Sequence, residues 1–205
     1  MAHFDHFNFI APLYDRLIKP SDPARISSLA GLPVSGNLLD VGGGTGRSSF
    51  ALQKMVTRVT IVDSSMGMLT QAARKSSLFM VCSHAEGLPF KDKSFDRVIM
   101  VDALHHVIDQ QTTIAELWRV VSAGGRLIIE EPDIRTFPMK VVAMFEKITL
   151  MRSHFLSPLQ IKAHFNFPDA QARIVQEGVT AWVVVDKVDG GNLTNLVSAA
   201  EQATT

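Results

Sequence analysis

A glycine-rich turn between an apolar run and a helix-compatible run constrains this chain more than any other feature. Residues 38–41 read Leu-Leu-Asp-Val, as a buried strand would, and residues 48–55 suit a helix. The glycines between them are Gly42, Gly43, Gly44 and Gly46. Glycine has no Cβ, so the turn can adopt positive φ and approach a ligand closely. The following helix aims its free N–H groups at the same place. This arrangement predicts the opening unit of a nucleotide-binding α/β sheet.

The spacing of the glycines limits the class of ligand that the turn can be expected to bind. A dinucleotide fingerprint, G-x-G-x-x-G, would need a third glycine at the position of Arg47. A phosphate-binding Walker loop needs Gly-Lys-Ser/Thr, which is absent here. The pattern is instead Asp40-x-Gly42-x-Gly44-x-Gly46. A nicotinamide oxidoreductase is therefore disfavoured, and for this motif alone a plain strand-to-helix turn remains the alternative.

The Asp-x-Gly-x-Gly-x-Gly pattern resembles motif I of the class I S-adenosylmethionine-dependent methyltransferases. In that family the acidic residue lies near the amino end of the cofactor, and the glycine loop lies under its methionine and ribose portion. The resemblance implies that Asp40 and the four glycines bind S-adenosylmethionine. This cofactor has no phosphates, so the loop would serve close approach more than anion capture.

A second acidic residue closes the next predicted strand. Residues 58–63 form that strand, and Asp63 lies at its tip. A carboxylate there can accept hydrogen bonds from both ribose hydroxyls. The alternative role, capping the helix predicted over 66–75, is already available to Ser64 or Ser65. We therefore favour ribose binding for Asp63.

Two further blocks resemble the adenine-binding segments of the family. Residues 63–69 match the second block, which implies that Ser64 and Met68 border the adenine. Residues 83–90 match a block usually written Gly-Asp-Ala-Glu-x-Leu-Pro-Phe, which places Ala85 and Glu86 at the cofactor and lets the Ala85 backbone N–H bind adenine. His84 stands where the family has an aspartate, which accepts a hydrogen bond from the adenine amino group. A neutral imidazole can accept that bond in one tautomer, and an exposed loop residue is the alternative.

The fourth predicted strand ends in Asp102-Ala103-Leu104-His105-His106-Val107. Ligands of open α/β sheets bind outside the carboxyl ends of the strands, so we expect Asp102 and both histidines near the transferable methyl group. The Leu-His-His-Val run also resembles the family. One of two adjacent histidines should pack inward. A metal site is not expected, because neighbours in sequence point apart and no third ligand has suitable spacing.

A general base would aid an acceptor that loses a proton. The candidates are His105, His106 and His154, the last in the variable stretch where this family builds substrate pockets. A surface histidine is the alternative for His154. Near the N-terminus, residues 9–15 resemble the lid segment of methyltransferases related to the ubiquinone/menaquinone C-methyltransferases, the methyltransferase type 11 group, which implies that Tyr14 leans over the cofactor. A helix that simply packs on the sheet is the alternative there.

The resemblance, which covers about residues 9–131, implies a Rossmann-like α/β fold. Its sheet has seven mostly parallel strands with an antiparallel last strand, and helices cover both faces. We expect one domain over 1–188, with a helical lid at 1–35 and a substrate-pocket insertion at 133–168. Residues 189–205 are small and polar and are expected to form a loose tail.

Composition excludes several classes of protein. The 205 residues are 46% apolar with a formal net charge of +0, so no nucleic-acid partner is expected. The single cysteine, Cys82, fits a reducing compartment, and we expect a cytoplasmic protein. No uninterrupted apolar run is long enough to predict a membrane span. The oligomeric state stays open, a homodimer included.

The sequence thus favours methyl transfer from S-adenosylmethionine to a small, apolar or aromatic acceptor by in-line displacement. A non-catalytic protein that binds S-adenosylmethionine, or regulates a partner, is the alternative, and the His84 substitution is the feature that favours it. The sequence leaves the acceptor and the methylated atom undefined.

Overall fold

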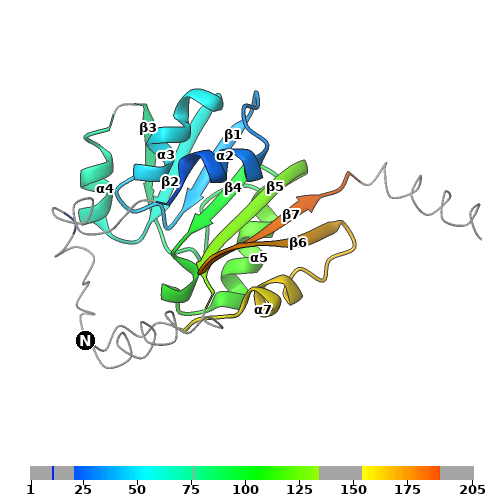
Figure 1. Cartoon of the computed structure of the whole chain (residues 1–205). Helices are drawn as coiled ribbons and strands as arrows, with labels where there is room; N and C mark the ends of the chain where they lie inside the picture. The colour runs from blue at the N-terminus through cyan, green and yellow to red at the C-terminus, as the bar shows by residue number, and fades with distance from the viewer. Residues whose placement is uncertain (1–10, 12–20, 76, 134–153, 190–205) are drawn as a thin grey trace, which may run out of the picture.

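The computed structural model describes residues 11, 21–75, 77–133 and 154–189, and these form a single sheet flanked by helices (Figure 1). The strands are β1 (Asn37–Val41), β2 (Arg58–Asp63), β3 (Leu78–Cys82), β4 (Phe95–Val101), β5 (Val121–Pro132), β6 (Ala170–Glu177) and β7 (Thr180–Lys187). The helices are α2 (Pro23–Ala30), α3 (Arg47–Leu52), α4 (Met66–Ala72), α5 (Gln110–Val120) and α7 (Pro158–Ala163), with short 3₁₀ turns η1 (Gln53–Met55) and η2 (Leu104–His106).

The strand order is β3-β2-β1-β4-β5-β7-β6 in a seven-stranded sheet. Strands β1 to β5 pair in parallel, and β7 runs antiparallel to both β5 and β6. The predicted fold class, including the antiparallel last strand, is therefore confirmed. The order reverses at β1, between β2 and β4, and ligands of such sheets bind at this reversal, outside the carboxyl ends of the strands.

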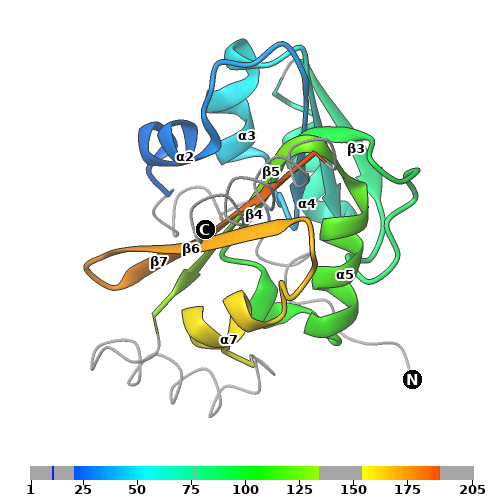
Figure 2. The ribbon, with the colours of Figure 1, turned by 90° about the vertical axis from the view of Figure 1, so that its right-hand side faces the viewer.

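Helices cover the sheet on both faces, as Figure 2 shows with α2 and α3 on one side and α5 and α7 on the other. One core joins α2, α3 and α4 to alternate sheet residues such as Leu38 and Ile61. The other joins α5 and α7 to the intervening residues, such as Leu39 and Val98. Because successive side chains of a strand point to opposite faces, β1 is buried on both sides. It therefore provides a rigid base for the glycine turn that follows it.

Most predicted boundaries hold, but β5 differs. In the sequence, the pair Gly124-Gly125 before the apolar residues 127–129 favours a turn followed by a strand from Arg126, whereas β5 begins at Val121. Val121 and Arg126 both pair with β4, and the register shifts between them. Gly124, with φ of 72°, lies in the shift, so the glycines form an irregularity inside the strand instead of a turn before it. The helix after β2 also ends earlier, at Ala72.

Several predictions concern residues outside the described part of the chain. These include Tyr14, most of the proposed lid, residues 134–153 of the proposed insertion, and the tail from 190. The described end of that insertion contains α7, which begins at Pro158 as predicted and is capped by Ser157. The division into lid, insertion and tail stays a prediction.

Candidate active site

The glycine turn is held by the neighbouring strand. The backbone N–H groups of Gly42 and Gly43 both donate to the carbonyl of Val62 in β2, at 2.8 and 3.2 Å. Gly42 has φ of 70°, and a Cβ there would lie 2.5 Å from the Cβ of Ala103. Such a contact is far inside van der Waals distance, so this position requires glycine. The turn is therefore packed directly against the segment that follows β4.

Asp63 joins the tip of β2 to the same turn. Its Oδ2 accepts the Gly44 N–H at 2.8 Å, and its Oδ1 accepts the Ser65 N–H at 2.8 Å. The N-cap of α4 is Ser65, whose hydroxyl accepts the Met68 N–H, as the sequence predicted. Among the described residues, a Cβ on Gly44 would meet nothing closer than 4.0 Å, the distance to both Asp63 Oδ2 and the Gly42 carbonyl oxygen. No other described atom therefore crowds the turn beside this carboxylate at the carboxyl edge of the sheet.

Asp40 lies beneath the turn and is only 2% exposed. Its Oδ2 accepts the hydroxyl of Ser49 in α3 at 2.6 Å. Burial, reinforced by the nearby charge of Asp63 and opposed by the Ser49 hydrogen bond, raises the pKa of Asp40 to about 6. A carboxylate that is costly to ionise gains most from a cation placed beside it.

The remaining predicted cofactor residues spread along the same edge. Met68 is buried in α4, and Ser64 is exposed before it. His84 is exposed and Ala85 is half-buried in the loop after β3. The carboxylate of Glu86 accepts the backbone N–H groups of Ile108 and Asp109, at 2.8 and 3.3 Å. Glu86 therefore ties its loop to the segment after η2.

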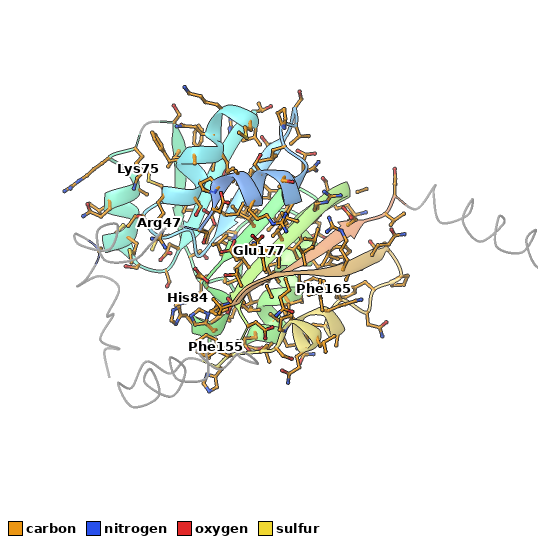
Figure 3. The ribbon with its side chains drawn as sticks, in the orientation of Figure 1. Arg47, Lys75, His84, Phe155, Phe165 and Glu177 are labelled. Carbon is orange, nitrogen blue, oxygen red and sulfur yellow. The ribbon has the colours of Figure 1, made fainter. Side chains whose placement is uncertain are left out.

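Asp102 ends β4 in the left-handed region, with φ of 50°. A non-glycine residue rarely adopts this conformation, and such strain gathers at functional sites. Its N–H donates to the Glu130 carbonyl at 3.0 Å, which continues the pairing with β5. Burial and the charge of Glu131 raise the pKa of Asp102, while His105 and Arg47 oppose the shift. Arg47, His84 and Phe155 come from different elements and lie toward the same end of the sheet (Figure 3).

The two adjacent histidines have different environments. His105 is 5% exposed, which confirms that one of the pair packs inward. Its Nδ1 lies 2.6 Å from Oε2 of Glu131. Its ring stacks on Phe155, with centroids 4.4 Å apart and planes at 17°. His105 is therefore held between the end of β5 and the segment that precedes α7.

His106 is half-buried and lies beside His105, with ring centroids 4.0 Å apart. Burial first, and the charge of His105 second, lower the pKa of His106 to about 3. His106 is therefore neutral near pH 7, and a neutral imidazole can accept a proton. The side chain of His154 is exposed, but its backbone N–H donates to the His105 carbonyl at 2.9 Å. All three candidate histidines thus lie in or beside η2.

Comparisons with known proteins agree with this geometry. Residues 39–129 match the family model described as a methyltransferase domain. The demethylmenaquinone methyltransferase of Tropheryma whipplei is 30% identical over 192 residues, which cover 89% of this chain and 77% of that protein. This chain belongs to the class I S-adenosylmethionine-dependent methyltransferase family. The enzyme of the same description from Thermobifida fusca is 33% identical over 175 residues, covering 81% of this chain and 69% of that protein.

Solved structures of this family share the fold. An S-adenosylmethionine-dependent methyltransferase from Thermotoga maritima superposes with a TM-score of 0.72 at 23% identity, covering 88% of this chain and 97% of that one. The methyltransferase is thus an enzyme of the methyltransferase type 11 group, as its motifs predicted, and the comparisons give no support to the non-catalytic alternative. None of the described helices has the length and apolar composition that crossing a bilayer requires. Within the described residues, His, Cys, Asp and Glu side chains form no group of three suited to a metal ion.

Sequence reasoning missed Glu131, the carboxylate paired with His105. It is 3% exposed, and a glutamate is almost never so buried unless it has a partner. A signal was present, since two glutamates, Glu130 and Glu131, follow the apolar residues 127–129 in one strand. Period-two alternation predicts that they face opposite sides of the sheet, but not which partner each one finds.

Proposed function

We propose that this methyltransferase transfers the methyl group of S-adenosylmethionine to a small aromatic acceptor of the quinol type, by in-line displacement at the carboxyl edge of the sheet. The observation that supports it most is one juxtaposition: the turn held by Asp63 packs through Gly42 on Ala103, immediately before η2 and its neutral His106. The donor and acceptor sides of the reaction would therefore meet at β1 and β4. Relatives that act on demethylmenaquinone supply the acceptor class.

The residues present fit S-adenosylmethionine. The Asp63 carboxylate at the tip of β2 suits two vicinal ribose hydroxyls. Asp40 is a buried carboxylate suited to a cationic amino group, and Ser64, Met68, His84 and Ala85 border the place where the family holds adenine. Open space around Gly44 leaves room for close approach of the ligand. When bound, the cofactor supplies a methyl group on a positively charged sulfur that leaves as a neutral thioether.

On the acceptor side, the task of the protein is orientation and removal of one proton. Fixing the acceptor in line with the donor can contribute about 7–11 kcal/mol. His106 is the base that we assign on its position, because it is half-buried in η2 beside His105 and its lowered pKa leaves the ring unprotonated near pH 7. Phe155, stacked on His105, offers an apolar aromatic surface beside that base.

The first test asks for donor binding. Calorimetry with S-adenosylmethionine, S-adenosylhomocysteine and NADH should give heat with the first two only. Asp63→Ala should weaken the binding of both S-adenosylmethionine and S-adenosylhomocysteine by about tenfold or more, since it removes charge-assisted hydrogen bonds. Asp22→Asn is the matched control, because Asp22 caps α2 by accepting the Ala24 N–H and has no part in the site. Unchanged affinity in Asp63→Ala would remove the basis of the proposal.

The second test asks for turnover. The wild-type enzyme, with radiolabelled donor, should label a reduced demethylmenaquinone or a shorter naphthoquinol, with one methyl group per molecule. Amines, nucleic acid and protein should stay unlabelled. A panel of acceptors in which only an amine or a macromolecule is labelled would retain the activity and refute the acceptor class.

A further inference from the structure

Both oxygens of the buried Glu131 carboxylate are used by η2. Oε1 accepts the Leu104 backbone N–H at 2.8 Å, and Oε2 lies 2.6 Å from Nδ1 of His105. The end of β5 therefore holds η2 by one backbone bond and one side-chain bond. The backbone bond fixes where η2 begins, and the side-chain bond fixes the ring plane of His105.

The chemistry of this pair determines the state of His105. A carboxylate only accepts hydrogen bonds, so the proton at this contact lies on Nδ1 of the imidazole. Leaving a buried carboxylate without this partner would be strongly unfavourable. Asp102 and His106 are two further titratable groups that interact with His105. The pair therefore keeps a proton on Nδ1 and fixes one orientation of the ring.

The His105 ring, once fixed, contacts the groups that face the acceptor. His106 lies on it with centroids 4.0 Å apart, and Phe155 stacks on it at 4.4 Å. The His105 carbonyl accepts the His154 N–H at 2.9 Å, and the Gln110 side chain donates to the carbonyls of Leu104 and His154. The chain entering residues 134–153 and the chain leaving them thus meet at one ring.

We infer that Glu131 is a positioning residue for methyl transfer: through His105 it sets the orientation of the His106 ring and of Phe155 toward the acceptor. This inference rests on the proposed function, in which His106 takes the proton. Glu131 is 3% exposed, so in this proposal it acts through His105 and not by contact with a reactant. Its loss should impair the reaction step more than the binding of either reactant.

The test compares Glu131→Gln with Glu130→Gln. The glutamine at 131 keeps the size of the side chain and an oxygen for the Leu104 N–H, but it presents N–H to His105 Nδ1 and so reverses the tautomer. Glu130 is the matched control, because it is a buried glutamate on the same strand, 4% exposed, and accepts the Trp182 indole N–H at 2.7 Å. Both variants change one buried carboxylate to an amide.

Four quantities are measured for each variant: kcat with a naphthoquinol acceptor, the Kd for S-adenosylmethionine, the ¹⁵N resonances of the histidine rings as a function of pH, and the melting temperature. Glu131→Gln should lower kcat by at least about tenfold, leave the Kd within about twofold, and shift the ring resonances of His105 and His106. Glu130→Gln should leave the resonances and kcat close to wild type. A purely structural role would lower the melting temperature in both variants without separating kcat from Kd.

Wild-type kcat and unchanged ring resonances in Glu131→Gln would overturn the inference, as would equal losses in the two variants. If Glu131→Gln does not fold, His105→Asn replaces it, because the asparagine N–H can still donate to Glu131 while the ring is gone, and wild-type kcat there overturns the inference too. Failure of the proposed function looks different: the wild-type enzyme would label no quinol, while the ring resonances would still respond to Glu131→Gln but not to Glu130→Gln.

Discussion

The turn after β1 and the segment after β4 lie against each other, yet they are held in place by different means. The proposed donor side, which comprises residues 42–46, Asp40 and Asp63, depends on backbone groups: the Val62 carbonyl of β2 and the Asp63 carboxylate bind glycine N–H groups. The acceptor side, which comprises η2, Glu131 and Phe155, depends on side chains from distant parts of the chain. The donor side should therefore tolerate little change of residue size, and the acceptor side little change of hydrogen-bonding chemistry.

The largest effect should come from the acceptor side, by His106→Gln. Removing a general base costs about 10²–10⁴-fold in rate, and we expect kcat to fall by about 10²-fold or more. The Kd for S-adenosylmethionine, measured by calorimetry, should change by less than about twofold because the donor side is untouched. His164→Gln, at the end of α7, serves as the control histidine. Equal losses of kcat and donor affinity would show that the two sides are not separable.

Gly42→Ala should disturb the donor side through size alone. A non-glycine residue at positive φ costs about 1–2 kcal/mol, and the contact with Ala103 adds overpacking of about 1–3 kcal/mol. Gly178→Ala is the matched control, since Gly178 has φ of 58° and nothing lies within 4 Å of its added Cβ. Denaturant unfolding should therefore show the larger loss for Gly42→Ala.

The double variant Gly42→Ala with Ala103→Gly sharpens this comparison. It removes the Cβ that the new side chain meets, so it should recover the overpacking part of the loss but not the backbone part. Donor affinity should recover in the same order. If the double variant is no better than Gly42→Ala, the requirement at position 42 comes from backbone conformation and not from the approach of η2.

Asp40 allows a test of the donor side by pH. Its folded pKa of about 6 lies above the ordinary value of 3.8, so the folded protein binds the extra proton. Its contribution therefore makes the free energy of unfolding rise as pH falls from above 6 toward 4. Asp40→Asn should remove this slope and stabilise the protein at pH 7 by up to about 3 kcal/mol. It should also weaken the binding of S-adenosylmethionine by about tenfold, because the cationic amino group loses a charged hydrogen-bond partner.

Ser49→Ala keeps the Asp40 carboxyl group but should raise its pKa further. The Ser49 hydroxyl lowers the pKa of Asp40, so its removal should move the loss of donor affinity, observed as pH falls, to a higher pH. In Asp40→Asn the affinity should be flat across this range. A wild-type affinity that is itself flat between pH 5 and 8 would show that Asp40 does not sense the cationic amino group.

The two sides also differ in how well the sequence predicted them. Local spacing was enough to predict that Asp40, the glycines and Asp63 lie together, because they belong to successive elements whose order fixes where they meet. The sequence suggested a helix cap or ribose binding for Asp63. Its hydrogen bond from the Gly44 N–H became visible only in the three-dimensional structure. On the acceptor side the sequence named the three candidate histidines, but it did not indicate which of them packs inward and which could act as a base. His105 meets a carboxylate 26 residues away and a ring 50 residues away, and no periodicity in a single chain reports such contacts.

The smallest effect should come from His84→Asp. This change introduces the carboxylate that relatives use for the adenine amino group, where a neutral imidazole accepts in only one tautomer. Donor affinity should improve by about two- to fivefold, toward the lower end of the about 0.5–1.5 kcal/mol that one hydrogen bond contributes, because position 84 is exposed, and kcat should stay the same. His84→Ala should weaken binding slightly if His84 contacts adenine, and change nothing if it is only an exposed loop residue. Binding of S-adenosylhomocysteine separates these two causes. A better adenine contact should tighten the binding of S-adenosylhomocysteine and S-adenosylmethionine equally. Attraction between the new carboxylate and the positively charged sulfur should tighten the binding of S-adenosylmethionine alone.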